Sequence, residues 1–427
     1  MIDRRPLLRT IFDAAVARAH PDRVLAQHLP QPPEGRILCL AAGKGAAAMA
    51  AAAEHHYLDT LGLSPERLLG LATTRHGHGR PTRRIEVIEA GHPVPDQASQ
   101  QAAERTLQLA GTAAADDLVL VLLSGGGSAN WIAPANGVTL AQKQELNRAL
   151  LRSGASIGAI NTVRKHLSRI KGGRLARAAQ PAPVVTLAIS DVPDDDPAVI
   201  ASGPTVADPT TLLDARAVLE RFAIVPDAAI QRALMDPANE SCKADDPVFA
   251  NARFTMIARP RDSLDAAIAA ATASGFEVMD LGELEGEARE VAAAHAQLAR
   301  KAHDAGRKLA ILSGGELTVT VRGRGRGGPN QEYVLALTSA LRDLDGIAAL
   351  AADTDGADGG GGSPGDPAGA FFDATTLQKM QSADLDPDAY LAENDATTFF
   401  ERTDDLVTTG PTLTNVNDIR VLLVDPK

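Results

Sequence analysis

One glycine-rich turn has the composition of a phosphate-binding loop. It follows the apolar run 118–123 and consists of Ser124, Gly125, Gly126, Gly127 and Ser128. Glycine lets backbone N–H groups approach an anion closely, and the start of a following helix would add a positive dipole. The turn lacks the GxxxxGK[ST] pattern of the common nucleotide-binding P-loop. We therefore expect it to bind a phosphate of a nucleotide, with a plain strand-to-helix turn as the alternative.

A second turn places a lysine between two glycines, directly after the apolar run 36–41. A lysine is a poor choice for turn geometry alone, so Lys44 is a candidate catalytic residue whose ammonium neutralises charge on a transferring phosphoryl group. Gly43, Gly45 and Ala48 also match the loose dinucleotide fingerprint G-x-G-x-x-[GA]. That fingerprint expects an acidic residue after the next strand, but the next candidate strand ends Thr-Thr-Arg. Dinucleotide binding is therefore the weaker interpretation.

The densest basic stretch of the chain runs from residue 161 to residue 174. Within it, Asn161, Arg164 and Lys165 are candidates to bind a small acid. Guanidinium and ammonium groups form charge-assisted hydrogen bonds with carboxylate or phosphate oxygens. The alternative is a solvated helix face, on which Asn161 would serve as a helix cap.

Carboxylates follow two further apolar runs. Asp191 comes after the first, where it could accept the proton of a substrate hydroxyl or bind a metal ion. The second run leads into a glycine-rich loop that continues to residue 365 and carries Asp353, Asp355 and Asp358. Hard oxygen ligands on such a loop suit Mg²⁺. We expect these three aspartates to bind the metal, with a solvated acidic turn as the alternative.

The C-terminal half repeats the pattern of an apolar run followed by Ser-Gly-Gly. The candidate nucleotide contacts of this half are Ser313, Gly314, Gly315, Glu316, Asn330 and Asn415. Between them, arginine alternates with glycine from residue 322 to residue 328. Guanidinium groups on a flexible backbone suit a polyphosphate, and Arg326 is the candidate catalytic residue of this loop. An RNA-binding interpretation of the loop conflicts with the acidic charge of the chain.

The composition argues against several classes of partner. The chain has 427 residues, a formal net charge of -12 and a sequence pI near 5.3. Nucleic-acid binding without sequence preference needs a basic surface, so we expect no nucleic-acid partner. No stretch approaches the ~20 apolar residues of a membrane helix, and we see no signal peptide. Cys39 and Cys242 form no CxxC pair, so we expect free thiols and a cytoplasmic protein.

Candidate strands alternate with candidate helices along the chain. The first helix candidate covers residues 6–29, and short apolar runs alternate with helical segments after it. Such alternation predicts an α/β fold with a parallel sheet. We expect a doubly wound, Rossmann-like sheet in residues 1–238, a linker rich in Pro, Asp and Asn at 239–250, and a second α/β domain in residues 251–427.

Eight motifs in order resemble the class II glycerate 2-kinase family, whose C-terminal part is the MOFRL domain. They are AAGKGAAAM, GHPVPD, LLSGGGSAN, NTVRKHLSRIKGGRLA, ISDVPDDDPAVIASGPT, LSGGELTVTVRGRGRGGPNQE, DTDGADG and TGPTLTNVNDI, from about residue 41 to 419. The resemblance implies ATP- and Mg²⁺-dependent phosphorylation of D-glycerate to 2-phosphoglycerate, in a cleft between two α/β domains. It also implies roles for Lys44 and for an arginine of the basic glycine loop. We expect a monomer or homodimer.

One departure and one alternative accompany this resemblance. Many members of the family read Gly-Gly-Arg-Asn where this chain has Pro329 before the asparagine, so Arg324 or Arg326 would have to replace that arginine. Members are also often labelled hydroxypyruvate reductases, so NAD(P)H-dependent reduction of hydroxypyruvate is the alternative function. The missing acidic ribose partner and the aspartate-rich loop favour the kinase. A nucleotide sensor without catalysis would leave Lys44 and Asp191 unexplained.

Overall fold

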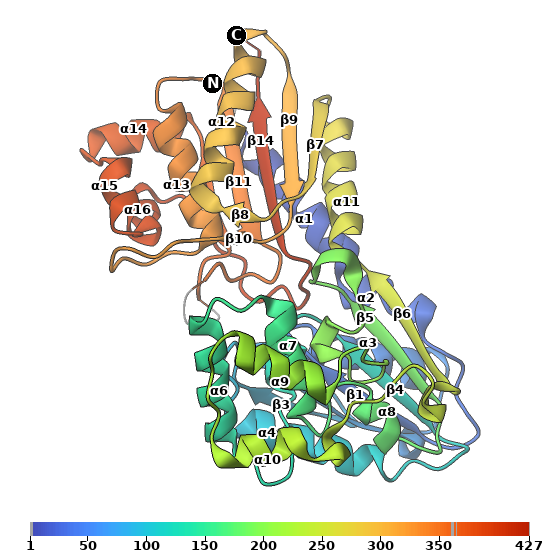
Figure 1. The fold of residues 1–427 in the computed structure, drawn as a ribbon. Coiled ribbons are helices and arrows are strands. Elements are labelled where there is room, and N and C mark those ends of the chain that lie inside the picture. The colour runs from blue at the N-terminus through green and yellow to red at the C-terminus, as the bar shows by residue number, and fades with distance from the viewer. Residues whose placement is uncertain (1–2, 360–362, 364, 427) are drawn as a thin grey trace. The chain divides into compact units, whose positions relative to one another are not determined.

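The computed structural model describes residues 3–359, 363 and 365–426. The chain divides into two compact units, residues 24–257 and residues 1–23 with 258–427. Each unit is built around a six-stranded sheet (Figure 1). Residues 360–362 and 364 of the expected glycine-rich loop lie outside the described residues. Within the residues described, none of the helices combines the length and the apolar character that a membrane crossing requires.

The sheet of the unit 24–257 has the strand order β3-β2-β1-β4-β5-β6. Its strands are β1 (Ile37–Ala42), β2 (Leu68–Arg75), β3 (Ile85–Ala90), β4 (Leu118–Leu123), β5 (Val184–Ile189) and β6 (Ala252–Ala258). The pairings from β3 through β5 are parallel. This is the strand order of a doubly wound fold, so the expected Rossmann-like sheet is confirmed. Strands β1 and β4 are buried along their whole length, which explains their continuous apolar runs.

Two groups of helices complete this unit. The helices are α3 (Ala46–Glu54), α4 (Gln97–Ala110), α5 (Gly127–Asn130), α6 (Leu140–Arg152), α7 (Ile157–His166), α8 (Arg174–Ala178), α9 (Leu212–Arg221) and α10 (Ala228–Met235), while α2 (Pro21–Val24) spans the boundary between the units. Short 3-10 or π segments are η1 (Ala26–His28), η2 (His55–Thr60), η3 (Pro65–Arg67), η4 (Pro193–Asp195), η5 (Ile200–Ser202), η6 (Pro237–Asn239) and η7 (Pro247–Phe249). Helices α4 and α8 pack on the sheet, whereas α6, α7, α9 and α10 share an apolar core of their own.

The second unit has a mixed sheet with the order β13-β12-β11-β14-β9-β7. Its strands are β7 (Glu277–Glu283), β9 (Leu309–Gly314), β11 (Ile347–Asp353), β12 (Gly369–Phe372), β13 (Leu406–Val407) and β14 (Asp418–Val424); β8 (Gly286–Glu287) pairs with β10 (Leu317–Thr318) separately. Only the β7–β9 pairing of this sheet is parallel among the described pairings. Because β14 runs antiparallel between β11 and β9, its first residues lie where those two strands end.

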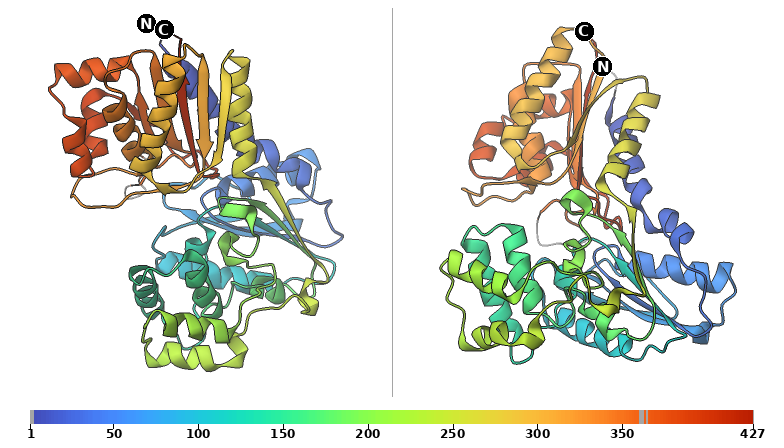
Figure 2. Two further views of the ribbon diagram at one scale, coloured as in Figure 1. Left: turned by 45° about the horizontal axis from the view of Figure 1, so that its top comes forward. Right: turned by 45° about the vertical axis from the view of Figure 1, so that its right-hand side comes forward.

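Helices cover both faces of the second sheet. Helices α1 (Arg5–Ala19) and α11 (Pro260–Ala273) bury one face. The opposite face is covered by α12 (Ala288–Asp304), α13 (Pro329–Leu341), α14 (Ala374–Ser382), α15 (Pro387–Ala392) and α16 (Ala396–Thr403). Figure 2 shows these layers, with α1 and α11 on one side of the strands and α12 on the other. The expected second α/β domain is therefore present.

The first unit begins and ends at later residues than expected: it covers residues 24–257, whereas the sequence predicts a domain at 1–238. Helix α1 packs against α11 and the second sheet, and Arg5 forms ion pairs with Asp373 and Asp405 there. Its amphipathic pattern shows that one face must be buried, but not against which unit. It also ends ahead of Pro21, because the residue before a proline disfavours helix. The expected linker 239–250 belongs to the unit 24–257, where the Cys242 amide donates to the Gly172 carbonyl oxygen and the Cys242 carbonyl oxygen accepts from the Asp208 amide.

Candidate active site

Three sequence-predicted groups meet at one edge of the parallel sheet. Strands β1, β4 and β5 are neighbours, and Leu123 lies in register with Ala42 on one side and Ala188 on the other. The carboxyl ends of parallel strands share an edge, which is where open α/β sheets bind ligands. Lys44 follows β1, the turn 124–128 follows β4, and Asp191 follows β5. The sheet therefore positions the candidate catalytic groups beside the candidate phosphate turn.

The backbone of the Gly43–Gly45 turn is used for packing inside the protein. The amides of Gly43, Lys44 and Gly45 donate to Thr73 O (3.1 Å), Gly125 O (2.7 Å) and Ser124 Oγ (2.9 Å), respectively. A Cβ atom on Gly43 would lie 2.3 Å from the Ser124 carbonyl oxygen, so only glycine fits there. A dinucleotide fingerprint offers such amides to a pyrophosphate. This turn instead fixes the position of the second turn.

The second turn keeps some of its backbone donors available, whereas the amides of Ser124 and Gly127 donate to the carbonyl oxygens of Ala42 and Ser124. The amides of Gly125, Gly126 and Ser128 have no hydrogen-bond acceptor in the described part of the chain. Gly126 has a φ of 84°, and a Cβ atom there would lie 2.9 Å from the His92 ring and 3.3 Å from Lys44 Cγ. The His92 ring and the side chain of the predicted catalytic lysine thus both lie next to Gly126. Its geometry suits an anion.

A pocket of about 630 Å³ lies beside this turn, entirely within the unit 24–257. Gly126, Ser128, Lys143, Arg164 and Lys171 line it together with the loop 92–95. Its volume is typical of sites for small ligands. Lysines are rarely buried, yet Lys143 is only 5% exposed and Lys171 only 2%. The pocket therefore concentrates buried positive charge.

No carboxylate in the described residues forms an ion pair with Lys143, Arg164 or Lys171. Burial lowers the pKa of Lys143 to about 7, and the charges of Arg164 and Arg174 add to this effect. Burial also lowers the pKa of Lys171, and that of the Arg164 guanidinium. An anion bound in the pocket would reverse these shifts, because opposite charge favours the protonated form.

Protein contacts hold each cation in place. Arg164 Nε donates to Asn147 Oδ1 at 2.7 Å, and Lys171 Nζ donates to the Ser128 carbonyl oxygen at 2.7 Å. Ser128 Oγ lies 2.7 Å from Ser202 Oγ, which links the turn to the segment after β5. Arg164, one of the predicted substrate-binding residues, thus lines the pocket in a fixed orientation.

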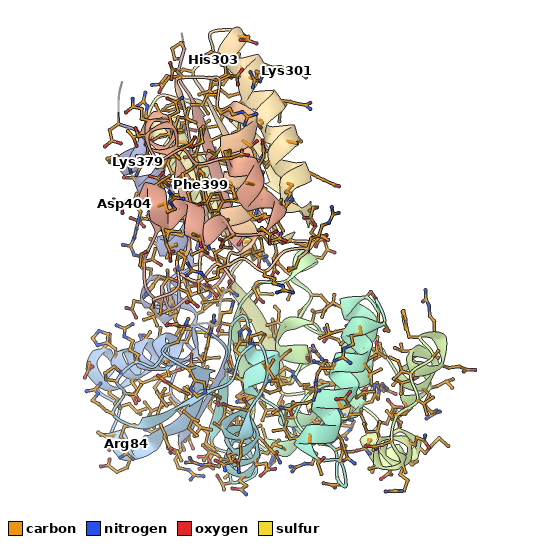
Figure 3. All side chains as sticks on the ribbon, turned by 90° about the vertical axis from the view of Figure 1, so that its left-hand side faces the viewer. Arg84, Lys301, His303, Lys379, Phe399 and Asp404 are labelled. Atoms are coloured by element: carbon orange, nitrogen blue, oxygen red, sulfur yellow. The ribbon has the colours of Figure 1, made fainter. Side chains whose placement is uncertain are left out.

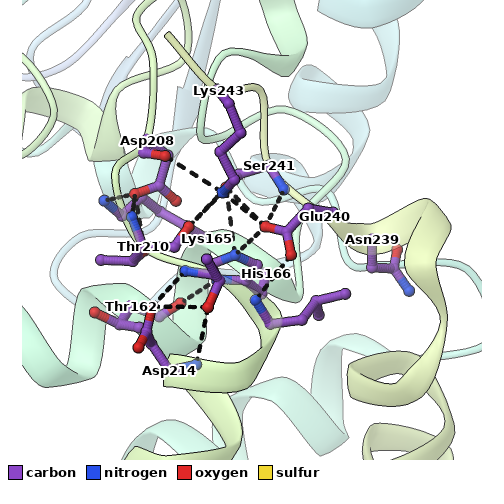
Figure 4. Close-up of polar contacts among 12 residues, drawn as sticks. Thr162, Lys165, His166, Asp208, Thr210, Asp214, Asn239, Glu240, Ser241 and Lys243 are labelled. Carbon is purple, nitrogen blue, oxygen red and sulfur yellow. Dashed lines mark hydrogen bonds and ion pairs between the residues drawn. The ribbon is translucent and has the colours of Figure 1, made fainter. Parts of the chain in front are cut away.

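The two other predicted substrate-binding residues do not line the pocket. Lys165 Nζ forms a buried ion pair with Asp208 Oδ1 at 2.7 Å (Figure 4). Asn161 Oδ1 accepts a hydrogen bond from Arg164 Nη1 at 3.5 Å. Consecutive residues of a helix point about 100° apart, so Arg164 and Lys165 cannot both face one site. Lys165 instead joins a network with Glu240 and Lys243 that ties α7 to the segments around it (Figure 4).

The Ser-Gly-Gly turn of the second unit is filled by an arginine. Arg420 is fully buried, and its Nε donates to Ser313 Oγ at 3.0 Å while Nη2 donates to the carbonyl oxygens of Gly314 and Gly315. A Cβ atom on Gly315 would lie 2.4 Å from the Leu284 carbonyl oxygen. The glycines here permit close packing of the backbone. Glu316, the next candidate, is exposed.

The predicted metal-binding aspartates have local structural partners. Asp358 accepts hydrogen bonds from the backbone amides of Asn330 (2.9 Å) and Gln331 (2.8 Å), and so caps the start of α13. Asp353 and Asp355 accept from backbone amides within their own loop. In the part of the chain that is described, no three His, Cys, Asp or Glu side chains are arranged to hold a metal ion. Asp358 therefore caps α13, and the binding of Mg²⁺ by these aspartates stays a prediction.

The remaining candidates of the second unit have polar partners near them. Asn330 Nδ2 bridges Asp358 (3.2 Å) and Asp418 (2.7 Å), and Asn415 Oδ1 accepts from the Asn417 amide at 3.4 Å. Burial raises the pKa of Asp358 to about 7, against the hydrogen bonds from α13. These groups gather where β9 and β11 end and β14 begins.

The basic loop presents its arginines to solvent. Arg326 has a side chain that is 61% exposed and pairs with Glu401 through both guanidinium Nη atoms. Cβ atoms on Gly323 and Gly325 would lie within 2.3 Å of Glu393 and Asp395, so the glycines pack inward. The alternation of the two residue types thus follows from an extended segment with one face against the protein.

Comparison with known proteins assigns the chain to a family. Residues 7–235 match a domain of unknown function, DUF4147, and residues 309–418 match the MOFRL family. A glycerate 2-kinase of Pyrococcus horikoshii is 38% identical over 418 residues, which cover 95% of this chain and 91% of that protein. The chain belongs to the class II glycerate kinase family.

Two further relatives of this glycerate kinase family extend the comparison. The crystal structure of a glycerate kinase from Thermotoga maritima superposes with a TM-score of 0.85 at 37% identity, covering 98% of this chain and 99% of that one. A protein of Agrobacterium vitis, provisionally named a hydroxypyruvate reductase, is 48% identical and covers 99% of this chain and 95% of its own length. The family resemblance seen in the eight motifs is confirmed.

The sequence prediction missed two lysines of the pocket as site residues. Lys143 lies on the buried face of α6 together with Leu146 and Leu150, which follow it by three and seven residues. A lysine on an apolar helix face is a signal that could have identified it. Lys171 belongs to the basic stretch that begins at Asn161, but nothing local distinguishes it from exposed neighbours such as Arg169.

Proposed function

We propose that the chain transfers the γ-phosphoryl group of ATP to the 2-hydroxyl of D-glycerate, giving 2-phosphoglycerate and ADP. The observation that carries this proposal is the pocket that Lys143, Arg164 and Lys171 line together with the turn 124–128, without a carboxylate partner among the described residues. A hydroxy acid and a phosphate donor are both anions, and such a pocket compensates both. Relatives named glycerate 2-kinase support the choice of substrate.

Arg164 is the proposed binding group for the glycerate carboxylate. Its Nε donates to Asn147 and one N–H of Nη1 donates weakly to Asn161, which leaves Nη2 and the other N–H of Nη1 for a ligand. Guanidinium binds a carboxylate through parallel hydrogen bonds. The backbone amides of Gly125, Gly126 and Ser128 are the proposed contacts for phosphate oxygens, beside Lys171.

Lys44 and Asp191 are the proposed catalytic residues. Lys44 lies beside Gly126, where its ammonium would stabilise the charge of the transferring phosphoryl group. Asp191, half-buried at the end of β5, would accept the proton of the attacking hydroxyl. Mg²⁺ is the proposed companion of ATP, and Asp355 its proposed protein ligand, because Mg²⁺ usually takes only one or two carboxylates.

Hydroxypyruvate reduction is the second candidate, favoured by the name of the Agrobacterium vitis relative and by the strand order of the first sheet. Two features oppose it. The amides of the Gly43–Gly45 turn already donate hydrogen bonds to oxygen atoms of the protein, and β2 ends at Arg75 rather than at an acidic residue. A dinucleotide would lack both its pyrophosphate cradle and its ribose partner.

One experiment separates the two functions. Purified protein is assayed for ADP release with ATP·Mg²⁺ and D-glycerate, and for NADH or NADPH oxidation with hydroxypyruvate. We expect only the first reaction, and a product phosphorylated at C2 by NMR. Reductase turnover without ADP release would refute the proposal.

Lys44→Ala tests the catalytic assignment within that assay. Removal of one preorganised charge costs about 3 kcal/mol of transition-state stabilisation, so kcat should fall about 100-fold. Lys301→Ala, an exposed lysine on α12, is the control and should keep wild-type turnover (Figure 3). A folded Lys44→Ala variant with near-normal kcat would remove Lys44 from the mechanism.

A further inference from the structure

Helix α6 contacts Arg164 through two polar side chains on one of its faces. Asn147 Oδ1 accepts from Arg164 Nε at 2.7 Å, and Lys143 Nζ donates to the Arg164 backbone oxygen at 3.3 Å. Lys143 and Asn147 are four residues apart, so they are neighbours on the helix surface. One helix thus holds both the main chain and the side chain of the arginine in the pocket.

Lys143 also anchors the end of the helix that carries Arg164. Its Nζ donates to the carbonyl oxygen of Leu167, the C-cap residue of α7, at 2.5 Å. A cation at this end of a helix satisfies the last carbonyl groups and interacts favourably with the helix dipole. The anchor fixes α7 one turn from the guanidinium.

Burial of this lysine is costly for the protein without a ligand. A buried ammonium with no carboxylate partner loses hydration that two carbonyl contacts replace only in part. An apolar side chain such as Met would fill the same position on the buried face of α6 beside Leu146 and Leu150. Packing alone therefore does not account for a lysine here.

We propose that Lys143 and Asn147 are positioning residues for the hydroxy acid, which hold the Arg164 guanidinium in the orientation that binds its carboxylate. The proposal rests on the proposed function. A free arginine side chain loses rotamer entropy on being fixed, and a preorganised one does not lose it again on binding. With Nε held by Asn147 and one N–H of Nη1 donating to Asn161, Nη2 and the other N–H of Nη1 are left for the ligand.

A kinetic double-mutant cycle tests the role of Asn147. KM and kcat for D-glycerate, and KM for ATP, are measured for Asn147→Ala, Arg164→Ala and the double variant. We expect Asn147→Ala to raise the KM for glycerate about 10-fold, the equivalent of one lost hydrogen bond to a charged group, with the KM for ATP unchanged. In the Arg164→Ala background the same change should have no further effect, because its target is gone.

Lys143→Met extends the test, with a matched control elsewhere in the chain. Lys379 also donates to carbonyl oxygens at the end of a helix, those of Thr403 and Asp404, the last residue and the C-cap of α16, and it pairs in addition with Asp405 (Figure 3). We expect Lys143→Met to raise the KM for glycerate about 10-fold, and Lys379→Met to change neither KM. If circular dichroism shows that Lys143→Met does not fold, the double-mutant cycle on Asn147 tests the proposal by itself. Asn147 is only half-buried, so its replacement should leave the fold intact.

The outcomes separate this proposal from the proposed function. A wild type that does not phosphorylate D-glycerate refutes the function and this role with it. A wild type that is active, with an unchanged glycerate KM in Asn147→Ala, refutes the positioning role alone. An effect that adds to that of Arg164→Ala also refutes it, because Asn147 would then act independently of the arginine.

Discussion

A single methyl group at Gly126 tests whether the turn 124–128 lies at the reacting groups. A Cβ atom there would lie 2.9 Å from Cδ2 and Nε2 of His92 and 3.3 Å from Cγ of Lys44. Ordinary contacts of this kind begin near 3.4 Å, so the imidazole must move by roughly 0.5 Å. Gly126→Ala therefore displaces groups of the pocket without removing any of them.

Gly137 provides a matched control. Its φ of 78° is close to the 84° of Gly126, but a Cβ atom there meets no atom within 4 Å. Both alanine variants incur the cost of left-handed backbone, about 1–2 kcal/mol, and both regain about 0.4–1 kcal/mol from the stiffer unfolded chain. The backbone term should therefore reduce the stability of each variant by about 1 kcal/mol, and any difference between them reports the contacts of Gly126.

Activity should distinguish the two variants where stability does not. Displacement of a catalytic group by 1 Å can cost about 100-fold in rate, so we expect at least a 10-fold lower kcat for Gly126→Ala and wild-type kcat for Gly137→Ala. The measurements are ADP release with D-glycerate and urea unfolding followed by circular dichroism. Equal kcat values in two folded variants would show that the turn is remote from the chemistry, and our placement of the active site would be wrong.

Three further predictions concern charge. Burial lowers the pKa of Lys143 from 10.5 to about 7, so the unfolded chain binds more protons than the folded one between these pH values. This residue therefore makes the free energy of unfolding rise with pH across that interval. In urea-unfolding measurements from pH 6.5 to 9, Lys143→Met should reduce this rise. Asp355→Asn should reduce turnover at limiting Mg²⁺ and recover part of it at high Mg²⁺, whereas an unchanged Mg²⁺ titration would exclude this ligand. Arg326→Ala should change kcat less than Arg324→Ala, because Glu401 already engages Arg326 on the surface; the reverse order in the ADP-release assay would restore Arg326 as the working arginine.

The sequence determined the features that depend on residues close together in the chain. Buried strands appear as continuous apolar runs, and glycine marks the turns that follow them, so the strand–turn–helix units around Lys44 and Ser124 were predicted. Parallel strands then bring these turns to a common edge as a matter of topology. Arg164 was found by its charge alone, because a dense basic stretch is unusual in an acidic chain.

Only the tertiary structure decided which partner satisfies each polar group. Lys143 reaches the carbonyl of Arg164 across 21 residues, Asp358 caps the helix at Asn330 across 28, and Arg420 fills the turn of Ser313 across 107. Two Ser-Gly-Gly turns of the same local form thus differ in whether a ligand can reach them: one lines a pocket, and the other is occupied by the side chain of Arg420. Local propensity sets where a turn forms, but side chains brought in by distant elements determine whether its donors and acceptors are left for a ligand.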